Sequence, residues 1–239
     1  MTGLDYSFSL GKIGVLERKI IPLSILQEIV ESPLEEAFSR IKDFFLVSAT
    51  FKREYKHLEN IFLIEQQFLK NLCLFLIKED SLKVILQYID EPQTLLEKNK
   101  LRKEVLNFFN FYFETLNIVN VLRIKAYSLK EDTYDYKRQE INLINLEKKF
   151  FGFFNELLRK IYYEAEELIR KECNYLLDFL VDKYFKLFFA STRMNLFGSQ
   201  LVFWYYFAKR LNCRIAKFLI LGKFYNLDKE KIKAVVDYA

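Results

Sequence analysis

The sequence predicts an all-α fold, and two observations carry that prediction. Only 6 Gly and 3 Pro occur in 239 residues, too few for the many turns of an all-β fold of this size. Hydrophobic residues make up 51% of the chain, and aromatic residues, with 25 Phe and 15 Tyr, make up 17%. A chain of this length and apolar content can bury a sizeable core. We therefore expect a single all-helical domain over residues 1–239, because no low-complexity linker divides it.

Apolar residues at helical spacing predict the elements of the first half. The expected helices are 5–21, 24–31, 33–45, 51–77, 81–89 and 94–128. Pro22 ends the first of these, and Pro33 suits the first turn of the third. The helix over 94–128 is apolar nearly all round, so we expect it to be central.

The second half follows the same spacing. The expected helices are 140–171, 174–190, 200–224 and 228–237. Residues 130–140 are highly charged and give the weakest helical pattern, and residues 194–199 read as a loop with Gly198. We expect the first and last segments of the chain to pack together.

One ten-residue pattern occurs three times, around Lys19, Lys125 and Lys223, at spacings of 106 and 98 residues. Each copy reads as a helix end, a corner and a helix start, with Ser24 and Asp228 as N-caps after the outer two corners. The period predicts repeat units of roughly 20–125 and 126–223, closed by segments 1–19 and 224–239. The lysines either cap helix carbonyls or form a basic ring facing a partner, and both interpretations stay open.

The net charge of +5 is unevenly placed. Residues 183–239 hold 11 Lys and Arg against 3 Asp and Glu, whereas the rest of the chain holds 26 against 29. A basic end suggests an acidic partner surface, although a solvated helix face is the alternative. The candidate partner residues are Arg123, Lys125, Lys209, Arg210, Arg214, Lys217 and Lys223.

Catalytic, cofactor and metal sites are not expected. His57 is the sole histidine, and Cys73, Cys173 and Cys213 form no CxxC pair. Gly222-Lys223 lacks the earlier glycine and the following Ser or Thr of a phosphate loop. A cluster of carboxylates at Glu164, Glu166 and Glu167 reads as a solvated helix face.

Neither a signal segment nor a membrane span is expected. The first 20 residues alternate polar and apolar side chains. The longest uncharged run, 194–208, has 15 residues, fewer than the roughly 18–20 apolar residues that a spanning helix needs.

The stretches 197–209 and 214–223 resemble the C-terminal pattern of one family, the C/d subunits of archaeal and bacterial V-type ATPases. The matching residues are Phe197, Gly198, Tyr205, Ala208, Lys209, Arg214, Gly222 and Lys223, with Lys217 in place of a second Arg. The middle copy is similar to an internal motif of that family through Asn117, Leu122, Arg123 and Lys125, with Glu114 in place of Asp. Residues 16–26 resemble its first helix and corner.

The resemblance implies a non-catalytic rotor part, a funnel of helical lobes that joins the central shaft of the ATP-hydrolysing head to the membrane ion-carrying ring. The implied partners are shaft subunits of the D and F type and the ring. The implied location is peripheral, on the cytoplasmic side of the membrane, with no homo-oligomer and no nucleic acid. The transported ion, proton or sodium, and the direction, synthesis or hydrolysis, stay open.

Departures from the family pattern bear on the shape. Asn212 replaces a Glu, and Ser199 and Leu201 replace two prolines. The chain is about one repeat shorter than the three-lobed members, so we expect two full repeats with closing terminal helices, in the form of a funnel or a two-lobed wedge. The alternative function is a basic helical scaffold or nucleic-acid-binding protein, whose affinity would fall steeply with salt.

Overall fold

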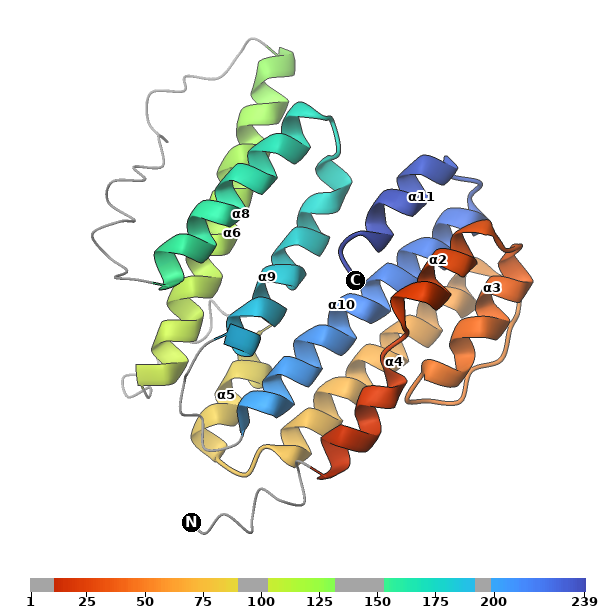
Figure 1. Ribbon diagram of the computed structural model, residues 1–239, viewed down its shortest axis with the longest axis horizontal. Coiled ribbons are helices and arrows are strands. Elements are labelled where there is room, and N and C mark those ends of the chain that lie inside the picture. Colours follow the sequence, from red (N-terminus) through yellow and green to blue (C-terminus); the bar gives the residue numbers. More distant parts are fainter. Residues whose placement is uncertain (1–10, 90–102, 132–152, 192–198) are drawn as a thin grey trace.

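Helix α10 (Ser199–Phe224) runs through the middle of the computed structural model, with α9 (Leu177–Ser191) on one side and α4 (Tyr55–Leu76) on the other (Figure 1). The structure describes residues 11–89, 103–131, 153–191 and 199–239, and these contain helices and connecting segments but no strand. The all-α prediction is confirmed.

The remaining helices complete an array around α10. Their bounds are α2 (Leu23–Glu31), α3 (Leu34–Ile41), α5 (Asp80–Tyr88), α6 (Lys103–Glu131), α8 (Phe153–Arg170) and α11 (Lys229–Val236). Residues 11–16 are also helical, and short 3-10 helices cover Glu17–Lys19, Lys42–Phe44 and Asn174–Leu176. The expected helices over 24–31, 51–77, 81–89, 200–224 and 228–237 lie within a few residues of these bounds. The expected loop at 194–199 and the weak helix at 130–140 lie almost wholly outside the described residues.

Two hydrophobic cores share α4 and α10. The first, which we call the aromatic core, is built from α5, α6, α8, α9, the second half of α4 and the first half of α10. Its rings stack closely: Phe111 and Phe188 have centroids 4.7 Å apart, and Phe189 and Phe207 have centroids 5.2 Å apart. Packed aromatic pairs of this kind add to the stabilisation from buried area.

The second core, which we call the terminal core, joins the two ends of the described chain. It contains α2, α3, α11, the first half of α4 and the second half of α10. Helices α2 and α11, near the two ends of the described chain, pack against each other. Of the expected closing segment 1–19, residues 1–10 lie outside the described residues. Because α4 and α10 contribute to both cores, the described helices form one continuous packed body.

The helix over 94–128 was expected to be central, and that expectation is wrong. In the described residues α6 begins at Lys103, and it lies at one edge of the array against α8, α5 and α9 (Figure 1). Leu106 and Ile124 on its outer side are exposed. The apolar run 108–113 produced the all-round pattern, and its rings pack into the aromatic core.

The corner expected at the middle lysine pattern is also absent. Helix α6 continues through Glu131, so the boundary at 125/126 falls inside a helix. The reason is local, since no Pro or Gly occurs between residues 103 and 131, and Ser is only mildly unfavourable in a helix. The outer two copies have real breakers: Pro22 is extended and directly precedes α2, and Asn226 adopts a positive φ of 54° after α10.

The caps expected after the outer corners differ in outcome. Asp228 caps α11 by accepting a hydrogen bond from the Glu230 amide at 3.0 Å, as predicted. Ser24 does not cap α2, because that helix begins one residue earlier, directly after Pro22. Proline presets the helical entry there and makes the serine cap unnecessary.

Helices α4, α5 and α6 belong to the first expected unit, and α8, α9 and α10 belong to the second. The helices of the two units do not run in matching directions. Helix α4 of the first unit runs antiparallel to α10 of the second, whereas α6 of the first runs parallel to α8 of the second (Figure 1). Both cores combine residues from units 20–125 and 126–223, so these units do not form two separate cores.

Candidate functional site

The seven basic residues singled out in the sequence do not form one free surface. The side chain of Lys125 lies outside the described part of the structure. Lys209 is fully buried, so its expected place on a partner surface is wrong. The other five each approach an acceptor within the protein, on a neighbouring helix in every case.

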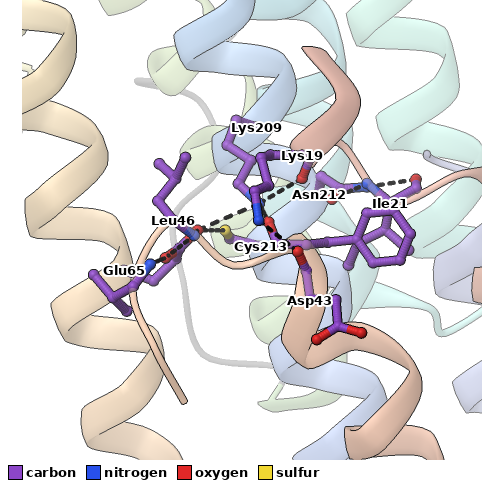
Figure 2. A network of polar contacts seen from close by, with 10 residues as sticks. Lys19, Ile21, Asp43, Leu46, Glu65, Lys209, Asn212 and Cys213 are labelled. Carbon is purple, nitrogen blue, oxygen red and sulfur yellow. Dashed lines mark hydrogen bonds and ion pairs between the residues drawn. The ribbon is translucent and has the colours of Figure 1, made fainter. Parts of the chain in front are cut away.

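Lys209 lies at the centre of a buried polar network (Figure 2). Its Nζ donates to the carbonyl oxygens of Lys19 and Phe44, both at 2.8 Å, and lies 3.3 Å from Glu65 Oε1. An ammonium group has three N–H donors, so the two carbonyls use two of them, and the nearby carboxylate supplies the opposite charge. The lysine thereby ties α10 to two separate segments of the N-terminal region.

Glu65 on α4 completes the pair, and its side chain is also fully buried. Its carboxylate accepts from the Leu46 amide at 2.9 and 2.8 Å and from the Val47 amide at 3.2 Å. Burying two ions is costly unless they are paired and their remaining hydrogen-bonding groups are satisfied. The backbone of residues 44–47 supplies that satisfaction, because it leaves helical geometry after Phe44 and has unpaired groups to offer.

Asn212 lies one turn further along the same face of α10. Its Oδ1 accepts from the Ile21 amide at 2.9 Å, and its Nδ2 donates to the Ile21 carbonyl at 3.1 Å. One amide side chain thus satisfies both backbone groups of Ile21, which lies between two helical segments. We call Glu65, Lys209 and Asn212 the polar clamp, because together they hold residues 19–21 and 44–47 against α4 and α10.

The outer two pattern lysines act as caps, one of the two interpretations left open, although the carbonyls belong to neighbouring elements. Lys223 Nζ donates at 2.8 Å to the carbonyl of Val30 in the last turn of α2. Burial lowers the pKa of Lys223. Lys19 Nζ donates at 2.6 Å to the carbonyl of Asp43. Both contacts stabilise the ends of short helices in the terminal core.

The candidate arginines converge on one face of α9. Arg123 of α6 donates to Asp178 at 2.8 Å. Arg214 Nη1 lies 2.7 Å from Asp182, and Arg210 Nε lies 3.7 Å from the same carboxylate. Asp182 is buried, so its charge requires these partners. The arginines therefore join α6 and α10 to α9.

The charged side chains of the polar clamp are engaged with backbone groups and with each other. Burial raises the pKa of the neighbouring Cys213 thiol to about 12, which disfavours its nucleophilic thiolate form. Among the described residues no group of three or more His, Cys, Asp or Glu side chains is placed to hold a metal ion. No helix of the described ranges combines the length and hydropathy needed to cross a bilayer.

The carboxylate cluster on α8 is only partly a solvated face. Glu167 pairs with Lys171 in solvent, as expected. Glu164 instead accepts from the Tyr184 hydroxyl at 2.7 Å and from Lys183 at 3.0 Å. Burial and this hydrogen bond raise the pKa of Tyr184, so the group joins α8 to α9.

Sequence reasoning missed Glu65 and Asp182, the buried carboxylates among the residues that the structure describes. A signal was present: Glu65 falls between Ile61 and Leu69 at the helical spacing of the apolar residues of α4. A charge on an apolar helical face predicts a buried partner of opposite sign. Lys209 likewise lies among the apolar residues of α10. The spacing along each helix does not reveal that Glu65 and Lys209 pair with each other.

Comparisons with protein-family models, curated proteins and solved structures found no match.

Proposed function

We propose that this chain is a non-catalytic adaptor subunit of a V-type ATPase, which couples the rotor shaft of the ATP-hydrolysing head to the membrane ion-carrying ring. One observation carries the proposal: residues that match the C/d family pattern hold this fold together. Lys209 belongs to the polar clamp, Arg214 pairs with buried Asp182, and Lys223 caps α2. The resemblance thus falls on residues with an architectural role, which a shared fold would require.

Gly222 adds a further point of this kind. A Cβ at Gly222 would lie 3.2 Å from Ile232 Cγ1, closer than an ordinary contact, so the glycine permits α11 to pack tightly on α10. The family pattern has Gly at this position, followed by Lys. Both residues here set the geometry of the terminal core.

Stiffness also fits a torque-transmitting role. Long helices are packed through stacked rings, and the N-terminal segments are pinned to α4 and α10 by buried polar contacts. Close-packed interiors transmit strain rather than absorb it. In this proposal the chain lies on the cytoplasmic side of the membrane, meets D- and F-type shaft subunits and the ring, and forms no homo-oligomer.

The proposal is tested by affinity purification of the tagged full-length chain from native membranes, with the bound proteins identified by mass spectrometry. Head and ring subunits of a V-type ATPase are the expected partners. Their absence at low salt contradicts the proposal. Salt-sensitive recovery of DNA or RNA in their place supports the alternative of a nucleic-acid-binding protein.

A charge variant sharpens the test. In R123A/K217A two half-exposed cations are removed, whose partners Asp178 and Glu59 remain open to solvent. We expect weaker recovery of shaft subunits with unchanged circular dichroism. K160A/K171A is the matched control, since it removes two exposed, ion-paired lysines, one from α8 and one directly after it. Equal loss in both variants would show a general charge effect and not a specific contact.

A further inference from the structure

We draw no further inference here: the strongest candidate, the exposed apolar face of α4 that Ile64, Phe68 and Phe75 form, carries none because nothing in the structure shows what covers it.

Discussion

Lys209 and Lys217 lie on the same helix, eight residues apart, and each pairs with a glutamate of α4. Lys209 and Glu65 are fully buried, and their other hydrogen-bonding groups are filled by backbone of the N-terminal segments. Lys217 and Glu59 are 29% and 34% exposed, and their closest atoms lie 3.4 Å apart. The same two side-chain types therefore differ in their effect on stability. Loss of one partner of the buried pair should destabilise the fold strongly, whereas the solvent-accessible pair should contribute little.

Removal of Lys209 should have the largest effect on this comparison. In K209A, Glu65 is left as a buried charge without its partner, and two backbone carbonyls lose their donor. We expect a loss of about 3–5 kcal/mol in the free energy of unfolding, measured by urea denaturation. A loss below about 1 kcal/mol would mean that the pair is not buried in solution.

A second substitution separates charge from packing. K209M retains most of the lysine volume but still strands the Glu65 charge. Adding Glu65→Gln to K209M should recover part of the stability, because a neutral amide costs less to bury than an unpaired carboxylate. The opposite result, a double variant less stable than K209M, would contradict this expectation. It would show that the hydrogen bonds from the Leu46 and Val47 amides to the Glu65 carboxylate matter more than the cost of its unpaired charge.

The amide of the clamp should have the next largest effect. Asn212→Ala leaves the buried amide and carbonyl of Ile21 without partners, so we expect a loss of about 2–3 kcal/mol. Protection of the Ile21 amide against hydrogen exchange should fall at the same time. An unchanged rate of hydrogen exchange at Ile21 would mean that its amide does not donate to Asn212 in solution.

Burial beside the clamp should also make the free energy of unfolding depend on pH in alkaline solution. The group concerned is Cys213, whose Sγ lies 4.0 Å from Glu65 Oε1. Burial raises the pKa of this thiol to about 12, whereas the unfolded thiol ionises near 9.0. Between these values the unfolded state has released its proton and the folded state has not. Stability should therefore fall as pH rises above 9, by about 1.4 kcal/mol per pH unit from this group.

The variant Cys213→Ser isolates this contribution, because serine does not titrate in that range. The stability difference between the unaltered chain and C213S should be constant below pH 9 and should change above it. Urea denaturation at pH 8, 9, 10 and 11 measures the difference. Parallel curves across the whole range would contradict burial of the thiol.

The exposed pair should have the smallest effect. Lys217→Ala should cost less than about 1 kcal/mol, and the cost should vanish at high salt. The comparison with K209A at two salt concentrations is direct, because the Lys209 pair lies away from solvent and should be nearly insensitive to salt. A Lys217 cost as large as that of Lys209 would remove the distinction between the two regions.

The helical pattern of the sequence predicted most element bounds because apolar spacing is local. It failed at the middle lysine pattern, where similarity to the outer copies suggested a corner. Pro22 and Asn226 bend the chain at the outer copies, and the middle copy has no such residue. The lesson is that a repeated sequence pattern predicts a turn only when it includes a residue that terminates a helix.

The candidate site shows a different limit. Cations in the C-terminal region were candidates for a partner surface, with a solvated helix face as the alternative, yet Lys209 is buried and Arg214 pairs with buried Asp182. The distribution of charge along the chain does not reveal which cations pair with acceptors inside the fold. The acceptors of Lys209 come from residues 19, 44 and 65, more than a hundred positions away.

By itself, the sequence determined that this protein is helical, where most of its helices lie, and that its two ends carry apolar faces in need of cover. These properties follow from side-chain periodicity and from backbone breakers, which act over a few residues. Only the tertiary structure decided which helix became central, which charges were buried, and which apolar face of α4 stayed in water. Those outcomes depend on contacts between distant segments, since burial is a property of the neighbours a residue acquires and not of the residue alone.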